Sequence, residues 1–356
     1  MPAAIIPLVP SDTIWLSSDP FPTATAIALG QGWFEQAFDA CGYKVKALQD
    51  SREPALRSQH FYHDIKTLIR EGGNVHPLWT RADNLNQEGR DHTVVVGLTW
   101  HDEAQVLLGR PGATHDLRGK RLGLSKAAGE IDAWRAMALR AYDTALTLEG
   151  LTFDDVVLTD VQAPPLQWQN QNRIGGTRSQ VTEKALLDGE VDVIFAKGAN
   201  SVLFQQAHGL EVILDINRLD DPTLRVNNGT PRPITVHRHF LNDHPHLVKV
   251  YLQVINAAAL WVQSHEEEVA GVTAKETTPT CDTVHRGYAQ RFTGSFDVNL
   301  DPARIDALQS QADFLYHHKL IDARVKVSDW IDIAPLLAAK AEPITLPALK
   351  GLLDVA

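Results

Sequence analysis

Residues 116–125, DLRGKRLGLS, open the second of two folding units in this chain. They follow Arg110, Pro111 and Gly112, which break the preceding pattern, and KRLGLS begins a new strand. Downstream, short β-rich runs alternate with amphipathic helical runs. We expect helices at 133–146, 182–189 and 201–209, and strands at 154–160, 191–196 and 211–216. This order is typical of an α/β unit with mainly parallel strands.

The same alternation continues on both sides of this unit. Upstream we expect a helical run at 23–38 and strands at 13–17, 43–49, 92–98 and 104–110. Downstream, a strand at 234–241 leads into a long amphipathic helix over residues 244–275. The pattern predicts a first α/β unit that ends at residue 109 and a second that begins at residue 110.

Composition limits the classes of function. The 356 residues are 44% hydrophobic and 22% charged, which is typical of a globular protein large enough for two domains. A net charge of -11 argues against a nucleic-acid partner. No apolar run approaches the roughly 20 residues of a membrane span. The two cysteines, Cys41 and Cys281, have neither metal-site spacing nor a disulfide pattern.

The N-terminal residues have no basic region followed by an apolar one, so they do not have the pattern of a secretory signal. We expect a cytoplasmic protein if Met1 is the native start. A periplasmic location is expected instead if a signal peptide has been removed.

Three segments, in this order, resemble the type II periplasmic-binding-protein fold of nitrate, sulfonate and taurine binding proteins. They are residues 116–125, the helix-turn-strand ALLDGEVDVIFA at 185–196, and the long helix at 244–270. The resemblance covers nearly the whole chain. It implies a two-lobed α/β protein with a ligand cleft between the lobes. The first lobe would be discontinuous, with residues 1–109 and 225–356, and the second lobe would be residues 110–224. The resemblance also implies an ABC permease as partner if the chain serves transport.

Within that fold, the first lobe resembles the 2'-hydroxybiphenyl-2-sulfinate desulfinases, which release sulfite from an aromatic sulfinate without a cofactor. The matching elements are SSDPFP at 17–22, His60, and REGG at 70–73. The resemblance implies that Asp19, His60 and Arg70 are the catalytic residues. However, Asp19 stands where the family has its cysteine. Aspartate lacks the nucleophilicity of a thiolate, so thiolate chemistry is excluded at this position.

The chemistry of the matching residues fits an anion site. Arg70 can hold a carboxylate, sulfinate or sulfonate through two parallel hydrogen bonds, and Gly72 and Gly73 let backbone N–H groups approach the same anion. A purely structural alternative is that residues 70–73 form a helix C-terminus with a glycine cap. His60 can transfer a proton, or it can be a surface or capping histidine. His60 and His63 have the spacing of a metal pair, but no third ligand is apparent, so no metal site is expected.

Asp19 follows a predicted strand at the end where ligands of open α/β sheets bind. It can equally be the N-cap of the next helix. Beside a bound anion, burial and like charge would favour its neutral acid, which could protonate carbon as CO2 or SO2 leaves. An ionised Asp19 would instead suit a cationic amine.

Further substrate-binding residues are expected at turns where strands end. The first lobe contributes Ser17 and Ser18 beside the glycines. In the second lobe, strand-to-helix turns can bind an anion through N–H groups, although any such turn prefers small residues. The residues expected there are Ser125, Lys126, Gly129, Lys197 and Gly198.

Two functions remain in competition. The first is a cofactor-independent desulfinase-like or decarboxylase-like enzyme acting on a small aromatic anion. The second is the substrate-binding protein of a nitrate, sulfonate or taurine-type ABC importer. Enzymes of pyrimidine or menaquinone biosynthesis share the fold, but no motif here indicates them. The joint match of Ser17, His60 and residues 70–73 favours the enzyme.

Overall fold

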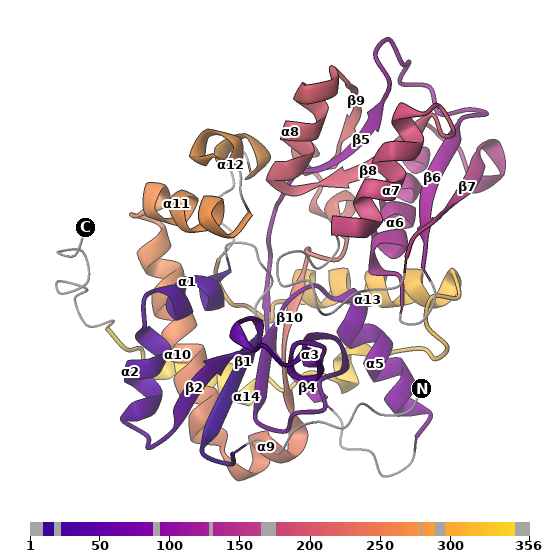
Figure 1. The fold of residues 1–356 in the computed structure, drawn as a ribbon. Coiled ribbons are helices and arrows are strands. Elements are labelled where there is room, and N and C mark those ends of the chain that lie inside the picture. Colours follow the sequence, from indigo (N-terminus) through magenta and orange to yellow (C-terminus); the bar gives the residue numbers. More distant parts are fainter. Residues whose placement is uncertain are drawn as a thin grey trace.

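The strands of the chain form two five-stranded sheets, in the lower and upper parts of Figure 1. The computed structural model describes residues 10–17, 23–87, 93–127, 131–164, 176–277, 280–288 and 296–345. The strand order is β2-β1-β3-β10-β4 in one sheet and β7-β6-β8-β5-β9 in the other. We call the parts of the chain built on these sheets the first lobe and the second lobe.

The sheet of the first lobe is parallel except for one strand. Its strands are β1 (Thr13–Ser17), β2 (Lys44–Ala47), β3 (Leu68–Glu71), β4 (Thr93–Thr99) and β10 (Arg232–His237). β1 pairs in parallel with β2 and β3, whereas β10 pairs antiparallel with both β3 and β4. β10 is therefore the strand that runs against the others.

The sheet of the second lobe repeats this plan. Its strands are β5 (Gln105–Gly109), β6 (Arg121–Lys126), β7 (Val157–Gln162), β8 (Val193–Lys197) and β9 (Glu211–Asp215). β6 pairs in parallel with β7 and β8, and β5 pairs antiparallel with β8 and β9. In both sheets the antiparallel strand takes the fourth place. In both, it is the first strand after the chain crosses from the other lobe.

The position of β5 corrects one expectation. The predicted boundary after residue 109 leaves this strand in the first lobe, but β5 lies between β8 and β9 of the second sheet. The apolar pattern of this strand is compatible with either sheet. The sheet to which it belongs is determined only by the strands with which it pairs. The first crossing is therefore the short segment 100–104, and the second is 216–231.

Helices cover both sheets. Those of the first lobe include α1 (Ala24–Gly30), α2 (Trp33–Asp39), α3 (Pro54–Arg57), α4 (Gln59–Tyr62), α5 (Val75–Leu85), α9 (Arg238–Asp243), α10 (Pro245–Val262) and α14 (Ala334–Ala341). Those of the second lobe are α6 (Ala133–Leu148), α7 (Gly176–Leu187) and α8 (Gly198–His208). The remaining ones are α11 (Glu266–Thr277), α12 (Cys281–Tyr288) and α13 (Pro302–His317). Among the described residues, no helix is both long and apolar enough to cross a bilayer.

Two long helices expected from the sequence are each divided. Gly32, with φ of 70°, separates α1 from α2, because the left-handed conformation ends the first helix. α10 ends at Val262, and the side chains of Ser264 and His265 donate hydrogen bonds back to the carbonyl of Trp261. Side chains that bond to the last carbonyls of a helix satisfy its end and allow the chain to turn.

Helix α12 joins the C-terminal part of the chain to the second lobe. It packs against α8, as Figure 1 shows, and the Gly287 carbonyl accepts a 2.6 Å hydrogen bond from the amide of Ala104 in the first crossing. A Cβ at Gly287 would lie 2.9 Å from the Cα of Ala199. This contact is too close for any side chain.

We expect Gly287→Ala to lower the free energy of unfolding by about 1–3 kcal/mol, because the added methyl group forces α12 away from α8. Urea unfolding followed by circular dichroism measures the change. Gly271→Ala in α11 is the matched control, because nothing lies within 4 Å of its added Cβ. Equal stability of the two variants would contradict close packing of α12 on α8.

Candidate functional site

Strand β3 carries Arg70 into the middle of the first sheet. Arg70 lies opposite Ser17 in the parallel pair of β1 and β3, and Gly72 and Gly73 follow before α5 begins. The alternative in which residues 70–73 form a capped helix end is therefore wrong. Both Ser17 and Arg70 are buried, at 0% and 1% exposure. They lie at the carboxyl ends of two neighbouring strands.

His60 connects these two side chains. It lies on α4, and its Nδ1 is 2.5 Å from Ser17 Oγ. A terminal nitrogen of Arg70 (Nη2) lies 3.3 Å from His60 Nε2, and Arg70 Nε donates a 2.6 Å hydrogen bond to the His60 carbonyl. The structure thus brings together three of the residues that the sequence singled out.

The direction of these hydrogen bonds fixes the imidazole tautomer. A guanidinium nitrogen can only donate, so His60 Nε2 accepts and the ring proton is assigned to Nδ1. Nδ1–H then donates to Ser17 Oγ, which also accepts from Gln49 Nε2 at 3.4 Å. With both donors aimed at its oxygen, Ser17 keeps its own O–H to donate to another acceptor. The arrangement makes Ser17 a hydrogen-bond donor.

The two glycines are required for this packing. A Cβ at Gly72 would lie 2.8 Å from a ring carbon of His60 and 3.1 Å from Arg70 Nη2. A Cβ at Gly73 would overlap the side chain of Asn228. The carbonyl of Gly73 accepts a 3.0 Å hydrogen bond from Arg70 Nη2. Gly72 and Gly73 therefore leave room for His60, Arg70 and Asn228, in addition to any contact with a ligand.

These contacts restrict how Arg70 can hold an anion. Its Nε and Nη2 already donate to the carbonyls of His60 and Gly73. A bidentate grip through Nε and Nη2 would have to break both of these bonds. The guanidinium therefore acts in this structure as a buried positive charge that orients His60.

A buried carboxylate next to Arg70 was not singled out from the sequence. Glu71 is 0% exposed and accepts hydrogen bonds from the amide of Thr25 at 3.2 Å and from the hydroxyl of Thr99 at 2.8 Å. Burial and, second, the charge of Glu71 raise the pKa of Tyr251 well above its ordinary value. Glu71 thus binds the first turn of α1 from within the protein, and no local sequence signal indicates this partnership.

Three asparagines outside the predicted set connect the glycine turn to the second crossing. Asn74 donates through its side chain to the carbonyls of Asn227 at 2.7 Å and Pro231 at 2.9 Å. The side-chain oxygen of Asn228 accepts from the amide of Val75 at 2.8 Å. In the sequence, Asn227 and Asn228 precede a glycine and look like an ordinary turn.

The turn expected to bind an anion after β6 is filled by an internal carboxylate. Asp132 accepts hydrogen bonds from the Ser125 hydroxyl at 3.0 Å and the Ala127 amide at 3.1 Å. Lys126 instead pairs with Asp160 at 2.7 Å, where its side chain is 56% exposed. Asp132 is therefore the anion bound by Ser125 and Ala127 in this structure.

Lys197 also meets an acidic residue of the protein. Its ammonium group lies 2.6 Å from Glu103 in the first crossing, and Arg232 lies 3.4 Å from the same carboxylate oxygen. Gly198, with φ of 70°, begins α8 and donates its amide to Ala104 at 2.8 Å. Lys197 and Gly198 thus join the second lobe to the crossing segment.

Asp19, Ser18 and Gly129 lie outside the described residues, so their predicted roles stay predictions. Ser17 directly precedes the segment that contains Ser18 and Asp19, and Thr23 follows that segment as the N-cap of α1.

His63 has a structural environment. It ends α4 in the left-handed conformation, with φ of 53°, and its ring nitrogens lie 3.1 Å from the Leu68 carbonyl and 3.2 Å from the Thr235 hydroxyl. Burial, followed by the charges of His237 and Arg70, holds the pKa of His63 well below its ordinary value. Within the described parts of the chain, no group of three or more His, Cys, Asp or Glu residues could hold a metal ion.

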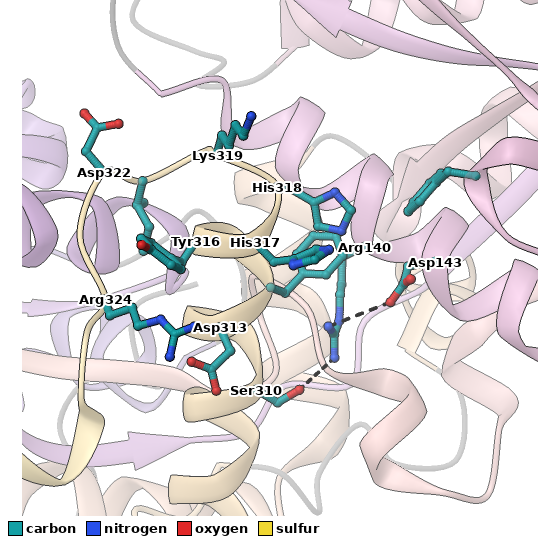
Figure 2. Close-up of a pocket in the computed structure, with 13 residues that line it drawn as sticks. Arg140, Asp143, Ser310, Asp313, Tyr316, His317, His318, Lys319, Asp322 and Arg324 are labelled. Atoms are coloured by element: carbon teal, nitrogen blue, oxygen red, sulfur yellow. Dashed lines mark hydrogen bonds and ion pairs between the residues drawn. The ribbon is translucent and has the colours of Figure 1, made fainter.

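A cavity of about 950 Å³ lies away from these residues, where α6 of the second lobe meets α13 (Figure 2). Arg140 on α6 donates a 3.0 Å hydrogen bond to Ser310 on α13, and its guanidinium lies 4.8 Å from the ring centre of Phe314. His318 packs between Phe314 and Phe153. Because Arg140 bonds across it to Ser310, we regard this region as a junction between α6 and α13.

Solved structures share the architecture of this chain. A cysteine-to-serine mutant of DszB in complex with biphenyl-2-sulfinic acid has a TM-score of 0.70 and 22% identity, over 92% of this chain and 99% of that chain. The periplasmic aliphatic sulphonate binding protein SsuA from Escherichia coli has a TM-score of 0.64 and 14% identity, over 95% of both chains. A putative sulfonate ABC transporter protein, the periplasmic sulfonate-binding protein SsuA from Methylobacillus flagellatus KT, has a TM-score of 0.68 and 16% identity, over 94% of this chain and 98% of that chain.

These similarities confirm the predicted α/β fold, which is like that of type II periplasmic binding proteins. The identities are low, so the neighbours establish the fold and leave both the enzyme and the binding protein open. No family model and no curated protein matches the sequence.

We expect the stability of the protein to fall in acid because His63 must remain neutral when folded. Its folded pKa is lowered, so the unfolded chain binds one more proton once the pH falls below about 6.5. The free energy of unfolding should then decrease by up to about 1.4 kcal/mol per pH unit from this group. Asparagine tolerates the left-handed conformation and does not titrate in this range. In His63→Asn, the free energy of unfolding should therefore fall less steeply between pH 7 and 5 than in the wild type. The free energies are measured by urea unfolding at each pH. An equal pH dependence in the two proteins would refute the role of His63 in acid destabilisation.

Proposed function

We propose that this chain is a cofactor-independent, desulfinase-like enzyme that removes the acidic group from a small aromatic anion. The observation that carries the proposal is the buried chain of hydrogen bonds from Arg70 through His60 to Ser17. In the sequence, Ser17 is followed directly by the segment that contains Asp19. The proposed catalytic residues are Asp19, His60 and Arg70.

Each residue has a distinct part in this proposal. The buried charge of Arg70 favours an anion nearby, since the interaction is poorly screened away from water. The Ser17 hydroxyl donates a hydrogen bond to an oxygen of the substrate. Asp19, as the neutral acid, delivers a proton to the ring carbon. The bond from that carbon to sulfur or to the carboxyl carbon then breaks, and SO2 or CO2 leaves while its bonding electrons stay with the ring. SO2 becomes sulfite in water, and His60 relays the replacement proton.

The second candidate is the substrate-binding protein of a sulfonate or nitrate importer, with an ABC permease as partner. Its support is the fold shared with the two SsuA proteins, which are described as sulfonate-binding. In that case the same residues would hold the anion without cleaving it. The two functions therefore differ in turnover and agree on a small anion as ligand.

Product release separates the two functions. We expect wild-type protein incubated with biphenyl-2-sulfinate, benzenesulfinate, benzenesulfonate and benzoate to release sulfite or CO2 from at least one of them. Asp19→Asn should bind that compound and release nothing, because the amide cannot supply the proton. Sulfite is measured with a thiol reagent, CO2 by a coupled assay, and binding by calorimetry. Tight binding without product in either protein would reject the enzyme and favour the importer component.

The Ser17 hydroxyl gives a test of the anion site itself. We expect Ser17→Ala to weaken binding of the anion found in that panel by about 10-fold to 100-fold, since a hydrogen bond to a charged group is worth about 1.5–3 kcal/mol. Ser58→Ala is the matched control, because its hydroxyl donates to the Ala55 carbonyl at 2.9 Å in the neighbouring helical turn. Equal affinities of the two variants would remove Ser17 from the site.

A further inference from the structure

Asn227 joins the candidate anion site to the second lobe. It lies in the second crossing, is 2% exposed, and donates a 3.1 Å hydrogen bond from its side chain to the carbonyl of Met137 in α6. Its side-chain oxygen accepts a 2.8 Å hydrogen bond from the amide of Asn228. A single carboxamide thus binds α6 on one side and the residue next to the glycine turn on the other.

From Asn228 the contacts continue without a gap to the catalytic residues. Asn228 fills the space beside Gly73, and its carbonyl accepts a 2.8 Å hydrogen bond from the amide of Asn74. Gly73 in turn accepts the hydrogen bond of Arg70 Nη2, and Arg70 holds His60. Since these groups are buried and closely packed, a shift of the second crossing must move the turn that holds Arg70.

Met137 also meets the second-lobe lysine. The Lys197 ammonium group lies 3.7 Å from Met137 Sδ and 2.6 Å from Glu103. The same residue of α6 therefore contacts Lys197 through its side chain and Asn227 through its backbone. Asn227 therefore lies at the point where a movement of α6 would displace the turn that holds Arg70.

We propose that Asn227 is a positioning residue: by holding α6 through Met137, it keeps the glycine turn, and through it Arg70, in the place that fixes the His60 tautomer. This inference rests on the proposed role of Ser17, His60 and Arg70 as the anion site. It adds a residue that acts on that site without touching the ligand, and it predicts that the site depends on the arrangement of the two lobes.

The His60 ring supplies a readout that needs no ligand. Proton–nitrogen correlation spectra of protein labelled with 15N-histidine distinguish the Nδ1–H tautomer from a mixture, and the His60→Gln variant identifies the signal. In the unsubstituted protein at pH 8 we expect the Nδ1–H pattern. In Asn227→Asp, which keeps an oxygen for Asn228 but loses the N–H to Met137, we expect the two nitrogen shifts to move towards each other as the tautomers exchange.

Two further variants make the test specific. Asn227→Ser also removes the donor, adds no charge, and should change the His60 signal in the same direction, which covers the case that Asn227→Asp does not fold. Asn299→Asp is the matched control, because Asn299 accepts from the amide of Leu300 at 2.8 Å in the segment beside β4, and it should leave the signal unchanged. An unaltered His60 signal in a folded Asn227 variant, or an equal change in Asn299→Asp, would overturn the proposal. If none of the panel anions binds, the proposed function is rejected. The proposal for Asn227 is then still decided by the His60 spectra.

Discussion

The hydrogen bond from Arg70 Nε to the His60 carbonyl is the contact on which the candidate site depends. A guanidinium that is 1% exposed is costly unless its donors are satisfied, and Arg70 meets part of this cost with the carbonyls of His60 and Gly73. Those two carbonyls belong to segments on either side of β3. Arg70 thereby fixes the ring of His60 against Ser17, and the glycines that follow are the residues that leave room for it.

Lys197 in the second lobe and Arg70 in the first lobe are held by different kinds of hydrogen-bond acceptor. In the second lobe, Lys197 meets Glu103 and the buried Arg178 lies 3.5 Å from Asp132, so the described cations near its strand ends have carboxylate partners. In the first lobe, Arg70 donates hydrogen bonds to the backbone carbonyls of His60 and Gly73 and to a ring nitrogen of His60. Carbonyl groups orient a guanidinium without cancelling its charge.

The sequence predicted the fold well where the signal is local. Strands such as β1 and β8 are runs of β-branched and apolar residues, and they were found within a few residues of their actual ends. β3 was missed because its four residues, LIRE, include two charged ones whose burial depends on β1 and β10, far away in the chain. Similarly, His60 and Arg70 could be named from the resemblance of their motifs to those of the desulfinases, but the partner of Lys197 could not be named from the sequence. Glu103 reaches it only because β5 and β8 pair in the second sheet.

The contacts between the lobes bear on which function fits the molecule. A carrier that takes up and releases its ligand must separate its lobes, whereas an enzyme needs only to admit substrate and release product. Here the second lobe is held to the rest of the chain by the bond of Asn227 in the second crossing to Met137, by Arg140 to Ser310, and by α12 against α8. At about 1 kcal/mol for each of the two hydrogen bonds, these bonds alone disfavour separation by about 30-fold. A carrier would have to break these contacts each time it opened to take up or release its ligand.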